Sequence, residues 1–283
     1  MVWRAAIKTA YDGRLFAGSQ RQPGLRTVEG EVIRTLKSIN AITDEKTSRF
    51  RAASRTDRGV SALGNVFAFD TEFRANELLK AMNSVAGDLY FYAIARAPLD
   101  FSPRRAKRRW YKYLVPKFDC DIDLMRKCAS LFEGRHDFKQ FCRRDGRKTL
   151  RTIDKIVVED YEGYLSIDFF ARDFLWNMVR KIVSAMISVS LGKSSIADLE
   201  DALAGKAIDF GMAPAENLVL MDVEYDISFE IQCTMPFLKN FARKRNEIEV
   251  QSFFFDHLKS VSCVNAQTLQ SIMFGLISSE RHT

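Results

Sequence analysis

The sequence has 283 residues, enough for one large domain or two ordinary ones, and a formal charge of +7 at pH 7. Its apolar runs are too short to span a membrane and its N-terminus has no secretory hydrophobic segment, so we expect a cytoplasmic protein without a membrane partner. Five widely spaced cysteines without a Cys-x-x-Cys pair, and only three histidines, argue against a disulfide framework, a histidine triad and a metal site. The sequence also lacks Gly-rich phosphate-binding motifs, so it gives no indication of a nucleotide cofactor.

The first half of the chain predicts the element order βαββαβ. Residues 3–9 alternate apolar and polar side chains, as in a strand, and Thr27 is placed to cap a helix. A second helix is expected to end near Gly87. The other expected strands cover residues 49–53, 66–69 and 89–95. This order is that of a ferredoxin-like unit, an antiparallel sheet with its helices on one face.

The second half repeats this order. A helix is expected to end at Gly134, a long helix to begin after Asp173 as its N-cap and to end at Gly192, and a short helix to cover residues 195–204. The expected strands cover residues 110–115, 152–159, 164–170 and 219–225, with a hairpin turn at Glu162-Gly163. The predicted fold is therefore α+β: two tandem ferredoxin-like units with antiparallel or mixed sheets joined into one large sheet, and helices on one face.

The predicted domains are residues 1–104, residues 105–230, and a helical extension over residues 231–283. The extension shows apolar spacing for one helix up to Phe255, with the run Phe253–Phe255 expected in the core, and for another beginning near Asn265. We expect this extension to cover the second unit or to form an oligomer contact.

One loop of the first domain brings a carboxylate between two guanidinium groups: Ser54-Arg55-Thr56-Asp57-Arg58-Gly59-Val60. Neighbouring positive charges keep a carboxylate ionised, so Asp57 is suited to act as a nucleophile or a base. Gly59 lets the backbone turn sharply. The alternative for so short a motif is a solvated surface turn.

Three long connections are rich in basic residues: residues 10–26, 104–109 and 135–151. Basic loops on a rigid scaffold are suited to gripping a phosphate backbone, although a solvated surface is the alternative. The candidate substrate-binding residues in these loops are Arg14, Gln20, Arg21, Arg104, Arg105, Arg108, Arg109, Arg143 and Arg144. We therefore expect a nucleic-acid partner.

Four motifs occur together in a fixed order. They are Tyr11-Asp12-Gly13-x-x-Phe16-x-Gly18-x-Gln20-x-Gln22, Arg55-Thr56-Asp57-x-Gly59-Val60, Tyr111-x-Tyr113 and Met178-Val179-Arg180-x-Ile182-Val183. In order and spacing the chain resembles the TruA family of tRNA pseudouridine synthases, as an archaeal-like variant with a C-terminal extension. The resemblance implies the isomerisation of uridine to pseudouridine at nucleotides 38, 39 and 40 in the anticodon arm of tRNA. It also implies a homodimer without metal or cofactor.

The resemblance also implies roles for single residues. Asp57 either adds covalently to the nucleotide or removes a sugar proton, and Arg180 pairs with it. Tyr111 stacks on the target base, and Arg55 stabilises the strand from which the base is flipped. Arg58 stands where a small residue is usual in the family, and is a further candidate substrate contact. The other departures from the family pattern are Ser54 for glycine, Ser61 for histidine and Ser19 for tryptophan.

Two other classes of function remain open at this stage. A non-catalytic RNA-binding protein on the same scaffold explains the basic loops but gives no purpose to Asp57, Tyr111 and Arg180 together. A metal-dependent phosphoester hydrolase needs several converging carboxylates, for which the sequence offers Asp12, Asp57 and Asp173. The arginines around Asp57 compete with a metal ion, which disfavours the second class.

Overall fold

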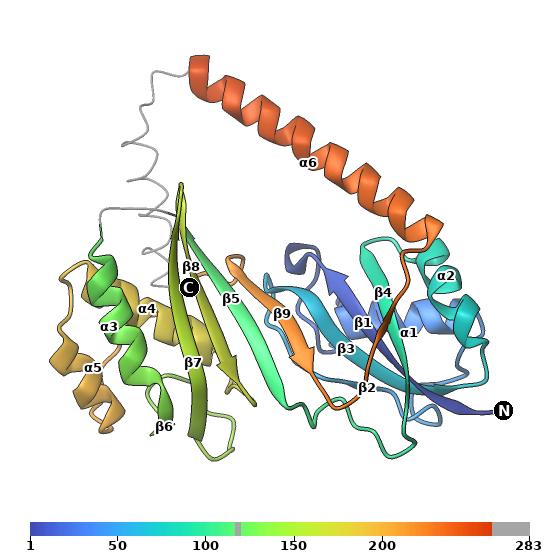
Figure 1. Cartoon of the computed structure of the whole chain (residues 1–283), viewed down its shortest axis with the longest axis horizontal. Coiled ribbons are helices and arrows are strands. Elements are labelled where there is room, and N and C mark those ends of the chain that lie inside the picture. Colours follow the sequence, from blue (N-terminus) through green and yellow to red (C-terminus); the bar gives the residue numbers. More distant parts are fainter. Residues whose placement is uncertain (117–119, 262–283) are drawn as a thin grey trace. The chain divides into compact units, whose positions relative to one another are not determined.

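The computed structural model describes residues 1–116 and 120–261 (Figure 1). The chain forms two compact units. The first unit contains Met1–Arg105 and the described residues from Tyr225 onward, and the second contains the described residues of Ala106–Glu224. In both units helices pack on antiparallel strands, so the predicted α+β class and the tandem ferredoxin-like plan are confirmed.

The first unit is built on β1 (Trp3–Tyr11), which pairs antiparallel with β3 (Ser61–Thr71) on one side and with β4 (Leu89–Ala97) on the other. The short β2 (Arg51–Ala52) pairs with β3 and β10 (Glu230–Ile231) pairs with β4. The two helices of the unit are α1 (Val28–Ser38) and α2 (Ala75–Val85), and a 3-10 turn, η1 (Gly13–Leu15), follows β1.

Helix α1 begins where the sequence predicts. The Thr27 side chain accepts a hydrogen bond from the Gly30 N–H at 3.3 Å, which satisfies one of the open amides of the first turn. Val28, Val32 and Leu36 recur on one face of the helix and are fully buried, because this spacing puts them on the side that packs in the core.

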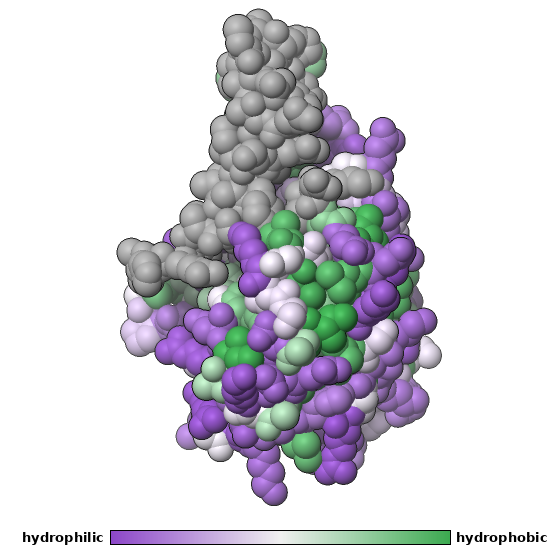
Figure 2. All heavy atoms as spheres, turned by 90° about the vertical axis from the view of Figure 1, so that its left-hand side faces the viewer, coloured by the Kyte–Doolittle hydropathy of each residue, from purple (hydrophilic) through white to green (hydrophobic). Residues whose placement is uncertain are grey.

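In the second unit, β5 (Arg108–Pro116) pairs antiparallel with β8 (Tyr164–Ala171) and with β9 (Leu218–Glu224). The sheet continues from β8 to β7 (Leu150–Tyr161) and β6 (Gly134–Asp137). The helices α3 (Ile122–Phe132), α4 (Met178–Ser190) and α5 (Ile196–Leu203) lie on one side of these strands (Figure 1). From the side of α3 and α5 the surface is largely hydrophilic, with a smaller hydrophobic patch (Figure 2).

The expected N-cap of α4 is wrong. The helix is preceded by Asn177, whose backbone is left-handed at φ +62°, and not by Asp173. Residues 173–175 stay non-helical, and the Asp173 carboxylate pairs with Arg151 at 2.5 Å instead of capping a helix. Strand β6 was also missed, because four residues are too short to show an alternating pattern.

The start of the C-terminal extension belongs to the first unit. The Asn240 side chain of α6 (Met235–Val261) donates to the carbonyls of Asn83 and Ala86 at 3.3 and 3.4 Å, at the end of α2. The ring of Phe237 lies edge-on to Tyr90 of β4 at 6.0 Å between centroids. The expectation that the extension covers the second unit is therefore wrong for this part.

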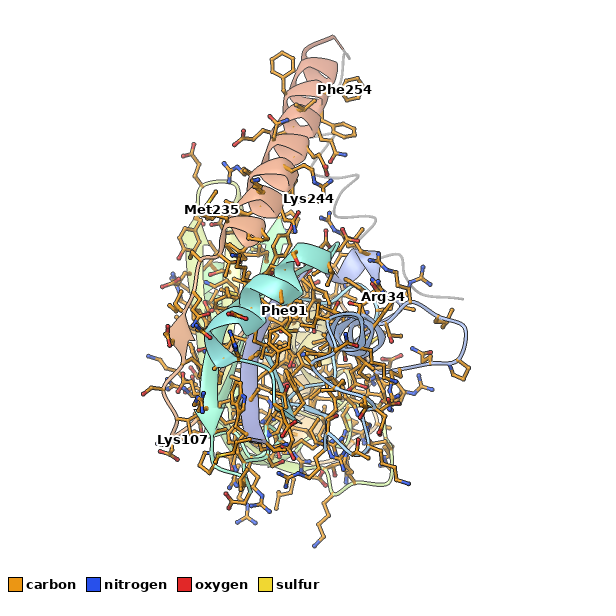
Figure 3. The ribbon with its side chains drawn as sticks, turned by 90° about the vertical axis from the view of Figure 1, so that its right-hand side faces the viewer. Arg34, Phe91, Lys107, Met235, Lys244 and Phe254 are labelled. Atoms are coloured by element: carbon orange, nitrogen blue, oxygen red, sulfur yellow. The ribbon has the colours of Figure 1, made fainter. Side chains whose placement is uncertain are left out.

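Helix α6 carries exposed aromatic side chains. Phe254 lies near the opposite end of the helix from Met235 (Figure 3). Phe253, Phe254 and Phe255 are each more than half exposed, so the expectation that this run lies in the core is also wrong. The second helix expected near Asn265 lies outside the described residues. None of the helices in the described ranges is long and apolar enough to cross a membrane.

Candidate active site

The loop from Ser54 to Val60 connects β2 to β3 of the first unit. Asp57 is half-buried in it, and Arg55 and Arg58 are exposed on either side. The turn is closed by a hydrogen bond from the Val60 N–H to the Asp57 carbonyl at 3.1 Å. Gly59 adopts φ +87°, a conformation that side-chain-bearing residues rarely take, so the predicted role of this glycine is confirmed.

The loop after β1 holds this turn in place. Thr56 donates its N–H to Ser19 Oγ at 2.7 Å, and the Ser19 N–H donates to the Thr56 carbonyl at 2.9 Å. The Gly59 N–H donates to the Gly13 carbonyl at 3.3 Å. The first two sequence motifs therefore form one structural element, because backbone groups of each satisfy those of the other.

Gly13 lies in close contact with the turn. A Cβ atom at Gly13 would lie 2.1 Å from the Val60 carbonyl oxygen and 2.7 Å from the Gly59 carbonyl carbon. Real carbon atoms do not approach backbone at such distances, so only glycine fits here. The contact is a direct measure of how tightly the two loops pack.

A buried polar network supports the residues just before Asp57. Asn65 of β3 is fully buried, and its amide nitrogen donates to the Ser54 carbonyl and to the Tyr11 hydroxyl, both at 3.1 Å. Its amide oxygen accepts the Ser54 N–H at 3.3 Å. The Tyr11 hydroxyl lies 2.9 Å from Thr56 Oγ1. Because this hydroxyl accepts from Asn65, its own proton is available for the Thr56 oxygen.

The second unit carries the other two predicted catalytic residues. Tyr111 of β5 is buried, with its ring edge-on to Phe174 at 5.3 Å between centroids. Arg180 lies in the first turn of α4, is 7% exposed, and donates from Nε to the Ala213 carbonyl at 2.6 Å. The Ala213 N–H donates back to the Arg180 carbonyl at 3.2 Å. Both side chains are thus fixed within the second unit, and the pairing of Arg180 with Asp57 stays a prediction.

Several of the predicted substrate-binding arginines already have carboxylate partners. Arg14 pairs with Asp12 at 2.6 Å, and this hydrogen bond lowers the pKa of the Asp12 carboxyl. Arg21 pairs with Glu45, whose pKa is lowered to about 2 because the carboxylate accepts hydrogen bonds from its own backbone N–H and from the side chains of Lys37 and Arg21. Arg108 pairs with Glu224 at 2.8 Å. Exposed pairs of this kind are worth about 0–1 kcal/mol, so a phosphate group can replace the carboxylate at little cost.

The remaining basic candidates differ in exposure. Gln20, Arg104, Arg105 and Arg144 are exposed. Arg143 is exposed and lies over the Trp176 ring at 4.2 Å from its centroid. Arg109 is only 7% exposed, and its guanidinium donates to the Arg172 carbonyl. A buried Arg109 suits a role inside the fold better than a contact with a phosphate.

Two of the three carboxylates considered for a hydrolase, Asp12 and Asp173, are engaged by arginines. Asp12 caps η1 and binds Arg14, and Asp173 binds Arg151. Across the two described ranges no three metal-ligating side chains of the His, Cys, Asp or Glu type lie together. This arrangement gives a metal-dependent mechanism no support.

Sequence reasoning missed the residues that hold the loop. In the sequence Ser19 stands out only as a departure from the family pattern, and Asn65 belongs to none of the four motifs. A signal for Asn65 exists, since it is the one polar side chain in the middle part of this strand, residues 62–69. No sequence signal shows that Ser19 meets Thr56, because the two residues are far apart in the chain.

Comparisons with known proteins agree with the motifs. A family model described as tRNA pseudouridine synthase matches residues 128–226. Proteins named tRNA pseudouridine synthase A from Pyrococcus horikoshii, Pyrococcus abyssi and Thermococcus sibiricus are 42%, 41% and 43% identical to this chain. The alignments cover 78%, 86% and 81% of this chain and 85%, 92% and 87% of those proteins.

Among solved structures, a chain of the "Crystal Structure of a Cbf5-Nop10-Gar1 Complex" aligns with 65% of this chain and 44% of its own length. The TM-score is 0.33 and the identity is 14%. Similarity at this level is too low to support any inference.

Proposed function

The chain belongs to the TruA family of tRNA pseudouridine synthases, and from this premise we propose that its target uridines lie in the anticodon arm of tRNA, at nucleotides 38, 39 and 40. The protein is an isomerase that converts uridine to pseudouridine. We also propose that it works as a homodimer in the cytoplasm.

The reaction defines what the site must do. The bond from uracil N1 to ribose C1′ breaks, the uracil rotates, and a new bond forms from C5 to C1′. C5 then loses its proton and N1 gains one, so the overall change is an isomerisation. No group is lost, and the site must retain the free base during its rotation.

The observation that carries the assignment of the catalytic aspartate is the way the Asp57 loop is held. Thr56 and Gly59, on either side of Asp57, are bound by Ser19 and Gly13 through backbone hydrogen bonds. A nucleophile or base works best when its position is fixed before the substrate arrives. We assign Asp57 this role, either by covalent addition to the nucleotide or by removal of a sugar proton.

Two residues of the second unit complete the proposal. Nε of Arg180 is used by the Ala213 carbonyl, and we propose that other guanidinium N–H groups bind the Asp57 carboxylate. We propose that Tyr111 stacks on the target base and that its phenol handles the C5 proton. Its position at the edge of Phe174 fixes the plane of the ring.

The target base must leave its stack to reach Asp57, at a cost of a few kcal/mol. We propose that the exposed Arg55 and Arg58 contact the RNA around the flipped nucleotide, because a planar guanidinium both stacks on bases and binds phosphates. The exposed arginines of the three basic loops then bind the tRNA backbone by its shape. Arg109 is not part of this set, because it is buried.

The test is incubation with unmodified tRNA transcripts, followed by mapping of pseudouridine at nucleotide resolution. The Asp57→Asn variant should form no pseudouridine while binding tRNA within a few-fold of the wild type. Asp100→Asn, which changes an exposed carboxylate of the same unit, serves as the control and should keep full turnover.

Each result has a distinct meaning. Product outside the anticodon arm would refute the proposed target, and turnover by Asp57→Asn would refute the catalytic assignment. Binding of tRNA by the wild type without any product would fit a non-catalytic RNA-binding protein. We expect full activity in a chelator, and a loss of activity there would point to a metal-dependent mechanism.

A further inference from the structure

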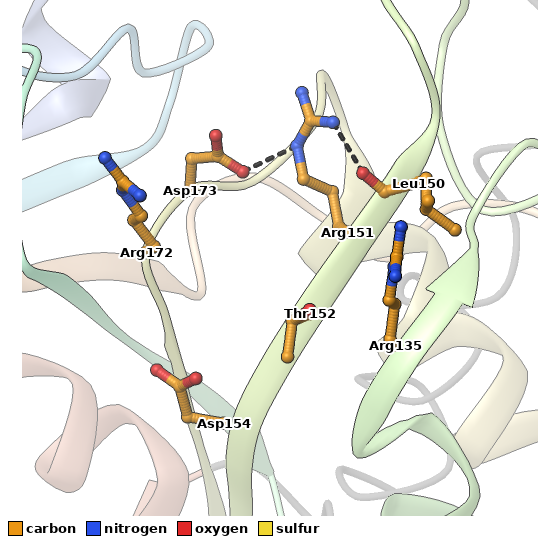
Figure 4. A pocket seen from close by; sticks show the side chains of 7 residues that line it. All are labelled: Arg135, Leu150, Arg151, Thr152, Asp154, Arg172 and Asp173. Atoms are coloured by element: carbon orange, nitrogen blue, oxygen red, sulfur yellow. Dashed lines mark hydrogen bonds and ion pairs between the residues drawn. The ribbon is translucent and has the colours of Figure 1, made fainter.

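A pocket with a volume of about 410 Å³ opens on the second unit, where β6, β7 and the chain after β8 meet (Figure 4). Its position follows from strand register. Arg135 of β6 is the antiparallel partner of Thr152 of β7, and the pair of Ile153 with Ala171 places Arg172 next to Thr152 on the other side. Arg135, Thr152 and Arg172 therefore form a row across three neighbouring chain segments.

This row faces away from the core. Ile153 is 1% exposed, whereas Thr152 is exposed, because successive residues of a strand point to opposite faces. Neighbouring strands lie about 4.8 Å apart, so the backbones of Arg135 and Arg172 are separated by roughly 10 Å. Two arginine side chains extending from such a distance can bind the same small anion between them.

Two other charged residues of the pocket, Arg151 and Asp173, bind each other and not the residues of this row. Arg151 Nε lies 2.5 Å from the Asp173 carboxylate, and its guanidinium also donates to the Leu150 carbonyl at 2.8 Å (Figure 4). Asp154 is the other acidic residue of the lining and is exposed. With three arginines and two aspartates, the lining keeps one excess positive charge.

In the part of the chain that the structure describes, Arg135 and Arg172 are not held in ion pairs, as several other loop arginines are. Within residues 1–116 and 120–261, the structure gives neither of them a carboxylate partner, whereas Arg14, Arg21, Arg108 and Arg147 are all paired. The backbone of Arg172 is also held in place, since its carbonyl accepts a hydrogen bond from the buried Arg109 guanidinium. The row thus offers two guanidinium forks without carboxylate partners and one hydroxyl donor.

We propose that Arg135, Thr152 and Arg172 bind one phosphate group of the tRNA backbone. This inference rests on the proposed function, which makes tRNA the substrate. Guanidinium groups bind the two non-bridging oxygens of a phosphodiester through paired hydrogen bonds, and a threonine hydroxyl adds a third donor. The contact contributes to affinity and orientation and takes no part in the chemistry.

The salt dependence of tRNA binding tests this proposal directly. Each phosphate contact releases counterions from the RNA, so the logarithm of the binding constant falls with the logarithm of salt concentration by about 0.7 to 1 per contact. In the double variant Arg135→Gln, Arg172→Gln this slope should be smaller by about one than in the wild type. The affinity near 0.1 M salt should fall roughly tenfold, because two charged hydrogen-bonding groups are lost.

The control is Arg126→Gln with Lys206→Gln. It removes the same charge from exposed side chains of the same unit, which lie outside the pocket and pair with Asp123 and Asp201. A second variant, Arg135→Lys with Arg172→Lys, keeps the charge and should retain the wild-type slope. Equal slopes for the pocket variant and the control would overturn the proposal.

Two further measurements distinguish this proposal from a site for free phosphate and from a failure of the proposed function. In the first, inorganic phosphate is added and the melting temperature is measured. A rise for the wild type but not for the Arg135→Gln, Arg172→Gln variant, with equal salt slopes of tRNA binding for the two proteins, would show a free-phosphate site and refute the RNA contact. Pseudouridine mapping should give the same product nucleotides and turnover in the wild type and in the Arg126→Gln, Lys206→Gln control. Failure of the proposed function would appear in the wild type itself, and not as a difference between variants.

Discussion

The backbone amide and carbonyl of Thr56 both bind Ser19, the first to its hydroxyl at 2.7 Å and the second to its amide at 2.9 Å. The residue that precedes the proposed catalytic aspartate is therefore held from both sides by a segment 37 positions earlier in the chain. The position of Asp57 therefore depends on this second loop as much as on its own.

Gly13→Ala should remove most of the activity. The new methyl group would lie 2.1 Å from the Val60 oxygen, so the two loops must move apart. A displacement of about 1 Å at a catalytic group can cost roughly a hundredfold in turnover. Gly87→Ala is the control, because nothing lies within 4 Å of the added atom. Comparable turnover of both variants in single-turnover assays would contradict a tight contact between the loops.

Asn65 and Asn83 form a natural pair for comparison. Both are buried in the first unit and both bind backbone groups, but Asn65 supports the Asp57 loop while Asn83 joins α2 to β4. Changing either to alanine should lower the free energy of unfolding by about 2 kcal/mol, since buried polar partners are left unsatisfied.

Only Asn65→Ala should also lower turnover, by roughly tenfold per folded molecule, because only it loosens the residues before Asp57. Urea unfolding gives the stability of each variant, and assays well below the melting temperature give turnover and KM for tRNA. Equal loss of turnover in both variants would mean that Asn65 acts through global stability alone.

Arg180→Lys should lower turnover by roughly tenfold to a hundredfold with KM for tRNA nearly unchanged. The lysine keeps the positive charge but lacks the planar fork that serves the Ala213 carbonyl and, as proposed, the Asp57 carboxylate together. Arg126→Lys on the exposed surface of α3 is the control and should have no effect. A fully active Arg180→Lys enzyme would remove the bidentate pairing from the proposal.

A buried ion pair should make the first unit sensitive to acid. Arg4 is 4% exposed and binds Asp70 at 2.8 Å. Burial alone would raise the pKa of the Asp70 carboxyl, but hydrogen bonds from Arg49 and Arg4 outweigh it, so the pKa lies below its ordinary value of 3.8. The stabilisation is complete above pH 3.8 and is lost as the pH falls through the lowered value.

Asp70→Asn leaves the buried Arg4 charge without its carboxylate. The variant should be less stable by about 3 kcal/mol at pH 7, and the difference from the wild type should shrink below pH 3.8. Urea unfolding at both pH values measures it. A difference that stays constant with pH would show that the carboxylate charge is not the cause.

The repeated βαββαβ order was predictable because the segments with alternating or helical spacing of apolar residues are long in this chain. Thr27 and Gly59 were predictable since a cap and a sharp turn have local requirements. The prediction of Asp173 as an N-cap was wrong although aspartate before an apolar run is a common N-cap. Its ion-pair partner Arg151 lies on β7, which a local pattern does not show. The bonds of Ser19 and Asn65 to the catalytic loop join distant segments, which local patterns do not record.

The register of β1 against β3, with Tyr11 opposite Ala62, sets more than the shape of a sheet. A slip by a single residue would turn the Tyr11 side chain to the opposite face and separate its hydroxyl from Thr56. Such a molecule would have normal mass and nearly normal helix content but no turnover. The active fraction of a refolded preparation therefore reports how faithfully two strands have paired.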